Sequence, residues 1–228
     1  MRATAIVPVK RFGEAKQRLL GALDRPQRAA VVKAMLADVL AAIGGAVRVE
    51  RIVVVTGEGR AERTALRAAQ RLVVPIEVLR DPVDAGHSRA ATLGIVRARA
   101  LGARCVALLP GDCPLLDGGE LDGAIERMHP GRVAVVPDRH GTGTNGLIMA
   151  PPDAIGPAFG PESRARHLDR AARRGHEAEV EELDSMGLDV DTPGDLADLA
   201  SVLTDEPGRA AETARELARL GLTGSRAR

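Results

Sequence analysis

The sequence predicts an α/β fold in which a mostly parallel β-sheet lies between helices. Short apolar runs rich in β-branched residues alternate with longer segments of helical periodicity, a pattern typical of parallel sheets covered on both faces. Polar clusters follow several of these runs, at the strand ends where open α/β sheets bind their ligands. With 228 residues and 45% hydrophobic content, the chain suits one domain that buries a full core, with or without a small appendage.

The strands and helices can be placed in order along the chain. Pro26 opens the first helix, whose apolar period of 3.6 residues stops at Gly44 and Gly45. Further helices are predicted at about residues 61–71, 88–101, 117–128 and 163–174. The predicted strands, which are short apolar runs, are Ala3 to Val9, Arg51 to Thr56, Ile76 to Leu79, Cys105 to Leu109 and Val133 to Val136.

The pattern changes after Val136. Asn145 to Ala150 is a further strand candidate with no helix before it, which indicates an antiparallel strand. We assign residues 1–205 to one domain and residues 206–228 to a C-terminal helix and tail. This terminal helix, at about residues 208–220, could pack on the domain or on a second subunit in a homodimer.

Charge and composition exclude several classes of partner. The 32 basic and 31 acidic residues are spread along the chain, and two Phe without Tyr or Trp offer no stacking platform, so no nucleic acid partner is expected. The first apolar run is too short for a signal peptide or a membrane span, so we expect a cytoplasmic protein with no membrane partner. Cys105 and Cys113 fit no metal-binding spacing and are expected to be reduced thiols.

A basic loop follows the first strand. Lys10, Arg11, Lys16 and Arg18 lie in it, at the carboxyl edge of the predicted sheet, where cations can grip phosphates. A solvated surface loop is the alternative interpretation, because runs of charge are usually exposed. No G-x-x-x-x-G-K-[ST] pattern occurs, which excludes a P-loop.

Carboxylates follow two other apolar segments. Asp112 lies between two nearby prolines, and this stiff backbone indicates a fixed position for the carboxylate. Asp189 and Asp191 alternate on a short predicted strand before a helix opens at Pro193. An acidic helix cap is the alternative for Asp191. Its combination with Asp112 favours a Mg²⁺ site, since Mg²⁺ is held by one or two carboxylates together with substrate phosphate oxygens.

Two later segments are candidate sites for a phosphorylated substrate. Gly141 to Gly146 contains G-x-G-x-x-G, but a strand rather than a helix follows, so we reject a dinucleotide fingerprint. The loop offers donors such as Thr144, and a plain turn is the alternative. Ser163 and the free amides of the helix after it form a natural anion site.

Charged residues near Ser163 strengthen that anion site. Arg164, Arg166 and His167 would add positive charge, although a surface position is the favoured interpretation for a single His without a visible partner. Gly86 and Ser88 precede or begin another helix beside the third strand, in a position suited to a base or ribose. A basic segment and acidic segments at one sheet edge together predict a nucleotidyltransferase.

Four motifs occur in a fixed order between Met1 and Leu203. They are Val-Pro-Val-Lys with Phe-Gly-Glu-Ala-Lys-x-Arg-Leu, Leu-Pro-Gly-Asp-x-Pro, Gly-Thr-Gly-Thr-Asn and Phe-Gly-x-x-Ser-x-x-x-His. In this combination the chain resembles the CofC/FbiD guanylyltransferases of coenzyme F-420 biosynthesis. The resemblance implies a single-domain, Rossmann-like nucleotidyltransferase fold of the glycosyltransferase-A type. It also implies transfer of GMP from GTP to the phosphate of phosphoenolpyruvate or 2-phospho-L-lactate, release of pyrophosphate, and a downstream transferase that accepts the unstable product.

The resemblance also implies roles for individual residues. The Mg²⁺ ligands would be Asp112 and Asp191, with Asp189 as a third carboxylate. The catalytic cations, which would neutralise the triphosphate and the departing pyrophosphate, would be Lys10, Lys16 and Arg18. The positions matching those that bind the phosphorylated three-carbon acid are Thr144, Gly160 and Ser163. An acceptor phosphate is already ionised near neutral pH and needs no general base, so positioning and charge neutralisation should carry most of the catalysis.

One segment departs from the family pattern. Relatives often have Gly-Leu-Asn followed by small residues, where this chain has Gly86-His87-Ser88-Arg89-Ala90-Ala91. Gly86 and Ser88 are kept as the nucleotide-binding candidates, but guanine preference rests on the resemblance alone. The residues do not decide between phosphoenolpyruvate, 2-phospho-L-lactate and a related acid such as 3-phosphoglycerate.

Other functions are also open at this stage. A molybdenum-cofactor nucleotidyltransferase resembles the chain in its Leu-Pro-x-Asp-x-Pro and Asp-Thr-Pro segments, but Val7-Pro8-Val9-Lys10 replaces its glycine-rich first loop. A non-catalytic nucleotide-binding module is disfavoured because both Asp112 and Asp191 are present. A purely structural scaffold gives no reason for basic and acidic segments to gather at one sheet edge.

Overall fold

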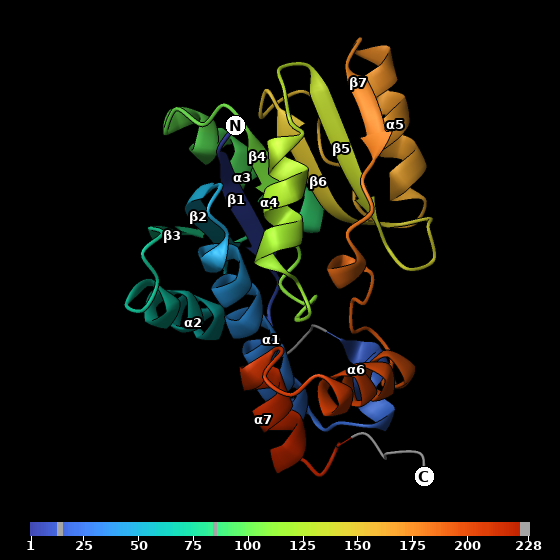
Figure 1. Cartoon of the computed structure of the whole chain (residues 1–228). Helices are drawn as coiled ribbons and strands as arrows, with labels where there is room; N and C mark the ends of the chain where they lie inside the picture. Colours follow the sequence, from blue (N-terminus) through green and yellow to red (C-terminus); the bar gives the residue numbers. More distant parts are fainter. Residues whose placement is uncertain (13–15, 84–85, 224–228) are drawn as a thin grey trace.

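One sheet of seven strands, in the order β3-β2-β1-β4-β6-β5-β7, organises the molecule (Figure 1). The computed structural model describes residues 1–12, 16–83 and 86–223. Every strand pairing among these residues is parallel except those of β6, which runs antiparallel to β4 and β5. The strands are β1 (Ala3–Val9), β2 (Val49–Thr56), β3 (Ile76–Arg80), β4 (Val106–Leu108), β5 (Arg132–Pro137), β6 (Thr144–Ala150) and β7 (Glu177–Val180).

This sheet confirms the predicted α/β class and the antiparallel strand at residues 145–150. Six of the seven predicted strands are present, within two residues of their expected ends. The edge strand β7 was not expected, because its sequence Glu-Ala-Glu-Val contains no apolar run and is largely exposed.

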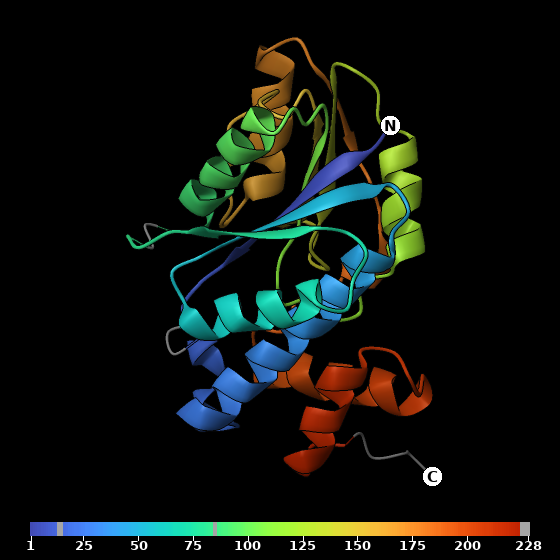
Figure 2. The same ribbon diagram turned by 90° about the vertical axis from the view of Figure 1, so that its left-hand side faces the viewer.

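Helices cover both faces of the sheet (Figure 2). On one face lie α1 (Arg25–Gly45), α2 (Gly59–Ala69) and α4 (Gly118–Glu126), and on the other α3 (His87–Ala100) and α5 (Ser163–Arg173). Alternate residues of β1 enter two separate cores: Val7 packs in the α1 core and Ile6 in the α3 core. The strand is therefore a continuous apolar run, as expected for parallel strands buried on both faces.

Local signals in the sequence explain where α1 begins. The Asp24 carboxylate accepts a hydrogen bond from the Gln27 amide at 2.8 Å, and the Gln27 side-chain oxygen accepts one from the Asp24 amide at 2.9 Å. This capping box, with Pro26 in the first turn, satisfies two amides that have no partner within the helix. The helix thus begins at the predicted proline to within one residue.

A glycine permits the close packing of α3 on β1. A Cβ atom at Gly94 would lie 2.3 Å from Cγ2 of Ile6, which is well inside van der Waals contact. A side chain at this position would push α3 away from the strand. The close contact fixes α3 against β1, and the first residues of α3 lie beside the carboxyl end of that strand.

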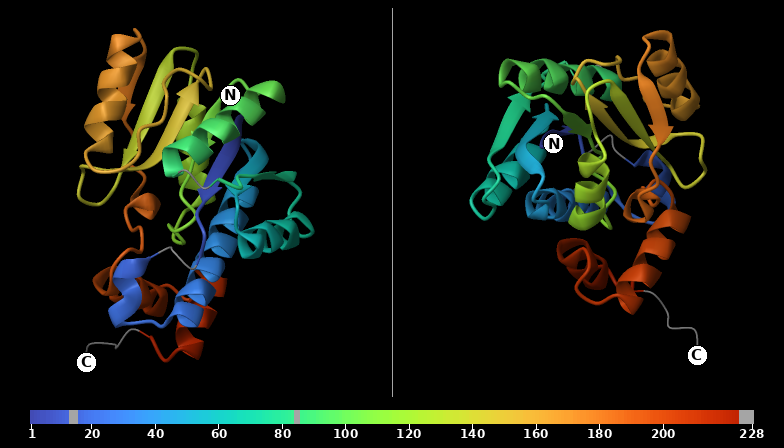
Figure 3. Two further views of the ribbon diagram at one scale, coloured as in Figure 1. Left: turned by 180° about the vertical axis from the view of Figure 1, so that it is seen from behind. Right: turned by 45° about the horizontal axis from the view of Figure 1, so that its top comes forward.

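The remaining helices gather beyond the carboxyl end of β1 (Figures 1 and 3). They are the 3₁₀ turns η1 (Gln17–Gly21) and η2 (Asp184–Met186), and the helices α6 (Pro193–Asp205) and α7 (Ala211–Arg219). Thr192 caps α6 as predicted, with its hydroxyl 3.2 Å from the Asp195 amide. The short strand predicted at residues 188–191 is wrong: this segment has no strand partner, and its amides bond to the Asp195 side chain and to the Asp112 carbonyl.

The C-terminal helix α7 packs on α1 of the same chain. The buried carboxylate of Asp38 on α1 accepts hydrogen bonds from the Thr213 hydroxyl at 2.6 Å, the Thr213 amide at 2.7 Å and the Glu212 amide at 3.0 Å. Burial raises the pKa of Asp38 despite these donors. The helix thus packs on the domain itself, and a contact with a second subunit stays a prediction.

Two smaller expectations can also be compared with the structure. Cys105 and Cys113 are both free and buried, as predicted. Within the described ranges, no helix combines the length and the apolar character that a bilayer crossing requires.

The Asp38→Ala substitution is expected to destabilise the protein by about 2–3 kcal/mol, because two amides and a hydroxyl of α7 would lose their buried acceptor. Urea denaturation measures the free energy of unfolding, and limited proteolysis reports release of α7. Asp198→Ala is the matched control, since Asp198 is exposed. If Asp38→Ala lowered the free energy of unfolding no more than the control does, the role of Asp38 in holding α7 would be contradicted.

Candidate active site

A cavity of about 300 Å³ opens at the carboxyl end of β1. The first loop contributes Lys10 and Lys16 to its wall, the segment after β4 contributes Asp112, the segment before α6 contributes Asp191, and α3 contributes His87. The structure therefore brings the basic loop and both acidic segments to one edge of the sheet, as the sequence predicts. This is the crevice in which open α/β sheets bind ligands.

The ammonium group of Lys16 lies between two carboxylates. It donates to Asp112 and, at 2.5 Å, to Oδ1 of Asp191. Its side chain is only 7% exposed, and its backbone is left-handed (φ 57°, ψ 42°), which is uncommon for a residue with a Cβ atom. Lys16 is thus held in one defined place by two segments far from it in the sequence.

Electrostatics keep Lys16 and Asp112 charged. Burial lowers the pKa of Lys16, but the charges of Asp112 and Asp191 outweigh burial, and the net shift is upward. For Asp112 the directions are reversed. Burial raises its pKa, but the charge and hydrogen bond of Lys16 bring this pKa below the usual range. A buried cation with two carboxylates needs all three partners, because removal of one leaves an uncompensated charge.

The segment carrying Asp191 is held by the first turn of α6. The Asp195 carboxylate accepts from the amides of Asp191 at 2.9 Å and Thr192 at 2.7 Å, and it pairs with Arg139 from the β5–β6 connection. Burial raises the pKa of Asp195, but the hydrogen bonds from the Asp191 and Thr192 amides, with a smaller contribution from the charge of Arg139, bring it below the usual range. Arg139 and Asp195 were not singled out from the sequence, where they look like ordinary surface charges.

Asp189 occupies a different position from the other two carboxylates. Its Oδ1 lies 3.3 Å from the side-chain nitrogen of Asn145, which also donates to the Met186 carbonyl at 2.7 Å. Burial and the nearby charge of Asp112 raise the pKa of Asp189. Among the described residues, no group of three or more His, Cys, Asp or Glu side chains is arranged to hold a metal ion. The structure thus brings Asp112 and Asp191 to one cation and leaves Asp189 beside them.

The other residues predicted to bind phosphate or nucleotide differ in their position relative to the cavity. Lys10 lines the cavity, whereas Arg18 is exposed on η1 and is not among the lining residues. Gly86 precedes α3 with φ 100°, a conformation that favours glycine. The Ser88 hydroxyl accepts from the Phe159 amide at 3.0 Å, so it links α3 to the segment before α5.

His87, to which the sequence assigned no role, lies in the cavity wall. Burial, with smaller contributions from Lys10 and Lys16, lowers its pKa to about 4. Its ring packs edge-to-face on Phe159, with centroids 4.7 Å apart. The only hint in the sequence was its departure from the family's usual residue at this position.

A second polar cluster forms around Thr144, Ser163 and His167. Ser163 and His167 stand one turn apart on α5 and are both fully buried. Nε2 of His167 accepts from the Ala158 amide at 2.8 Å. The proton of a neutral ring is then on Nδ1, which lies 3.0 Å from the Thr144 hydroxyl and donates to it. This arrangement leaves the Thr144 hydrogen available to donate elsewhere.

The interpretation of His167 as a surface residue is therefore wrong. Burial, followed by the charges of Arg170 and Arg166, lowers its pKa to about 4, so near neutral pH the ring also adds none of the positive charge expected at this helix start. The hydrogen-bond partner of His167 is Thr144, which lies 23 residues earlier. The sequence alone could not reveal this contact.

The loop before α5 is fixed by backbone contacts. The Arg166 guanidinium donates to the carbonyls of Ala158, at 2.8 Å, and Pro161, so its donors hold the loop. Gly160 has φ 119°, where any side chain would be strained, and its carbonyl accepts from the Ser163 amide at 3.1 Å. Gly160, Ser163 and Thr144 thus belong to one structural unit, and their role in binding the phosphorylated acid stays a prediction.

Comparison with known proteins identifies the family. Residues 3–223 match the family model described as "Guanylyl transferase CofC like". The chain belongs to this family. It is 42% identical over 215 residues to the phosphoenolpyruvate guanylyltransferase of Conexibacter woesei, covering 93% of this chain and 94% of that protein. It is 36% identical over 203 residues to the 3-phospho-D-glycerate guanylyltransferase of Phenylobacterium zucineum, covering 87% of this chain and 89% of that protein.

A solved structure supports the same fold. The putative nucleotide-diphospho-sugar transferase of Desulfovibrio desulfuricans superposes with a TM-score of 0.73 at 16% identity, covering 97% of this chain and 96% of that one. The predicted Rossmann-like nucleotidyltransferase fold is confirmed, and family membership makes the protein a guanylyltransferase. The molybdenum-cofactor and non-catalytic alternatives are not supported.

The buried His167 should make stability depend on pH. Its pKa is about 4 in the folded state and near 6.5 when unfolded, so protonation favours the unfolded chain. Its stabilising contribution is complete above pH 6.5 and is lost as the pH falls toward 4, by up to about 1.4 kcal/mol per pH unit. Urea denaturation from pH 7.5 to pH 4 measures this loss.

The His167→Asn variant lacks this titration, so its stability difference from the native protein should narrow as the pH falls. His140→Asn is the control, because His140 is exposed, and it should follow the native protein. A difference between His167→Asn and the native protein that is constant with pH would contradict the neutral buried ring.

Proposed function

We propose that this guanylyltransferase transfers GMP from GTP to the phosphate of phosphoenolpyruvate and releases pyrophosphate. The observation that carries the proposal is the convergence of Lys10, Lys16, Asp112 and Asp191 in one cavity at the carboxyl edge of the sheet. The 42% identity to a phosphoenolpyruvate guanylyltransferase supports the choice of acceptor. The reaction belongs to coenzyme F-420 biosynthesis, and a partner transferase would consume the unstable product.

We propose Asp112 and Asp191 as the ligands of a Mg²⁺ ion. Their carboxylates already share one cation in the structure, the ammonium of Lys16, and two carboxylates with phosphate oxygens are a usual Mg²⁺ ligand set. When bound, Mg²⁺ would neutralise charge on the phosphate oxygens of GTP. Asp189, held by Asn145, is proposed to add negative charge beside the pair.

The protein groups would act mainly by position and charge. An oxygen of the acceptor phosphate attacks the α-phosphorus of GTP, the bond between that phosphorus and the bridging oxygen breaks, and pyrophosphate leaves with the electron pair. Lys10 and Lys16 lie in the cavity wall and would stabilise the charge on the departing group. The acceptor phosphate needs no general base because it is already ionised. Arg18 would contribute only if η1 moved, because it is exposed outside the cavity.

The acceptor would bind at the cluster of Thr144, Gly160 and Ser163. The Thr144 hydroxyl oxygen accepts a hydrogen bond from His167. Its own hydroxyl hydrogen can therefore be donated to an anionic acceptor. Ser163 lies at the start of α5, where the positive end of the helix dipole favours an anion. The first two amides of the helix, expected to be free, already donate to the Gly160 and Thr142 carbonyls, so they do not add to this site. His167 acts as a positioning residue, because it orients the Thr144 hydroxyl.

A second acceptor is favoured by a separate observation. The relative from Phenylobacterium zucineum, 36% identical, carries the name 3-phospho-D-glycerate guanylyltransferase. This acid also combines a carboxylate and a phosphate on three carbons, so the same cluster could hold it. The third candidate is 2-phospho-L-lactate, which differs from phosphoenolpyruvate by reduction of the double bond.

Pyrophosphate release should require GTP, Mg²⁺ and one of the three phospho-acids, with phosphoenolpyruvate expected to be the best acceptor. The assay uses purified protein, GTP, ATP or CTP, and a partner transferase that traps the product. Asp112→Asn should lower kcat at least about a hundredfold, because both the proposed ligand and the partner of Lys16 are lost. Asp205→Asn, an exposed position on α6, should leave kcat unchanged. No turnover of any pair by folded protein would overturn the proposal.

Thr144→Val is expected to raise KM for the phospho-acid about tenfold or more and to leave KM for GTP nearly unchanged, because only the acceptor loses a hydrogen bond to a charged group. Steady-state kinetics with each substrate varied separates the two effects. Thr142→Val in the same loop serves as the control, since the Thr142 contacts seen in the structure are made by its backbone. Equal changes in both KM values would place Thr144 outside the acceptor site.

A further inference from the structure

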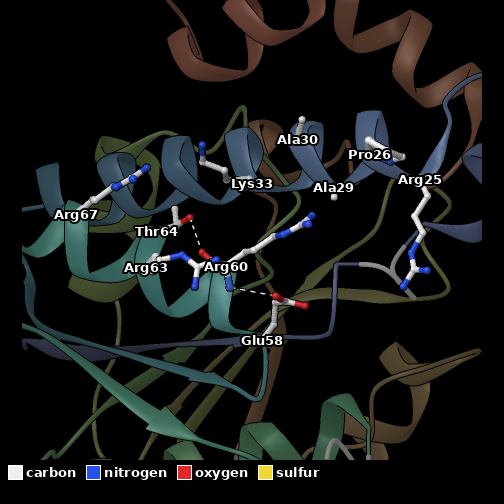
Figure 4. Close-up of a pocket in the computed structure, with 10 residues that line it drawn as sticks. All are labelled: Arg25, Pro26, Ala29, Ala30, Lys33, Glu58, Arg60, Arg63, Thr64 and Arg67. Carbon is white, nitrogen blue, oxygen red and sulfur yellow. Dashed lines mark hydrogen bonds between the residues drawn. The ribbon is translucent and has the colours of Figure 1, made fainter.

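A second, larger cavity lies between α1 and α2 (Figure 4). Its volume is about 670 Å³, which is in the range of small-molecule sites. Its wall is strongly basic, and Figure 4 shows cationic side chains from both helices around the same space. They are Arg25 and Lys33 from α1, and Arg60, Arg63 and Arg67 from α2.

The charge of these five side chains is not compensated by neighbours. In the part of the chain that the structure describes, none of the five forms an ion pair with a carboxylate. Elsewhere on the surface such pairs are common, as for Arg80 with Glu62 at 3.0 Å and Arg215 with Glu212 at 2.6 Å. Because the whole chain has a formal charge of only +1, this cavity is a local concentration of positive charge.

The positions on α2 follow the helical repeat. Arg60, Arg63 and Arg67 are spaced three and four residues apart, so they share one face of the helix. Among the described residues of the wall, the sole carboxylate is that of Glu58, which accepts from the Arg60 amide at 3.0 Å and so caps the helix. The start of α2 is therefore already satisfied, and the anion-binding capacity of the cavity comes from its side chains.

The rest of the wall is small and carries no base-recognising group. Pro26, Ala29 and Ala30 leave room between the helices, and the Thr64 hydroxyl donates to the Arg60 carbonyl at 2.9 Å. The wall, as far as the structure describes it, has no aromatic ring on which a base could stack and no side-chain amide to read one. Guanidinium groups bind phosphate oxygens in pairs, so the lining matches a compact anion with several phosphate groups.

We propose that this cavity is a binding site for a diphosphate or triphosphate group, separate from the catalytic cavity. The two cavities share no lining residue: Val32 of α1 lines the catalytic cavity, whereas the adjacent Lys33 lines the basic one. Two sources could supply such a group, namely free inorganic pyrophosphate or the phosphate chain of a nucleoside triphosphate. The site recognises the phosphates and ignores the nucleoside. This goes beyond the proposed reaction and is tested without turnover.

Isothermal titration calorimetry with inorganic tripolyphosphate at constant ionic strength tests the site. A Lys10→Gln background weakens phosphate binding in the catalytic cavity. In that background the protein should still bind tripolyphosphate, and the added triple substitution Arg60→Gln/Arg63→Gln/Arg67→Gln should weaken binding at least about tenfold. Lys33→Gln, on the opposite helix, should weaken it by a smaller factor. Melting temperatures check that each variant is folded.

The matched control removes the same number of charges elsewhere. Arg173→Gln/Arg215→Gln/Arg219→Gln changes three exposed arginines that already have carboxylate partners, and it should leave tripolyphosphate affinity unchanged. An equal loss in this control would show an effect of net charge only and would overturn the proposal. Undiminished binding by the α2 triple variant would overturn it as well.

Comparison of ligands distinguishes the two sources. In the Lys10→Gln background, GTP and tripolyphosphate should bind with equal affinity and pyrophosphate more weakly, because affinity follows the number of phosphate charges. GTP binding much more tightly than tripolyphosphate, with both lost in the α2 triple variant, would show that the cavity reads a nucleoside and would contradict a phosphate-only site.

Discussion

The buried ammonium of Lys16 joins parts of the chain that are far apart in sequence. Its two carboxylate partners are 96 and 175 residues away. Two carboxylates held this close repel each other, and a cation taken out of water needs counter-charges. The loop after β1, the segment after β4 and the segment before α6 are therefore mutually dependent, and the site exists only when all three are in place.

The antiparallel strand β6 completes the site. Leu147 and Met149 pair with Leu108 and Val106 of β4 in antiparallel register, so the first residues of β6 lie at the edge where β4 ends. Thr144 and Asn145 thus reach the same edge as Asp112. Had β6 been parallel, its last residues would lie there and the glycine-rich loop would be at the opposite end of the sheet. The single reversal in strand direction places the proposed acceptor cluster beside the carboxylates.

The sequence predicted those features that depend on local patterns. Apolar runs and helix caps gave the elements, and charged residues that follow or interrupt short apolar segments gave Lys10, Lys16, Asp112 and Asp191. Features that depend on tertiary partners were missed. His167 resembles a surface residue until Thr144 and Ala158 are brought against its ring. β7 has no apolar run because it is an exposed edge strand, held to β5 by backbone pairing and by the Arg132–Glu179 ion pair.

Charge balance distinguishes the two cavities on α1. In the catalytic cavity the buried cation is already matched by two carboxylates, so this site suits a ligand that brings its own counter-charge, such as a nucleotide with a divalent cation. In the basic cavity the described lining residues place five cations beside one carboxylate, and the polyanion proposed to bind there would relieve the repulsion among those cations. Adjacent residues of one helix, Val32 and Lys33, thereby line two cavities, for which we propose two kinds of phosphate recognition. In the catalytic cavity, recognition would depend on the positions of the reacting groups. In the basic cavity, it would depend on the density of positive charge.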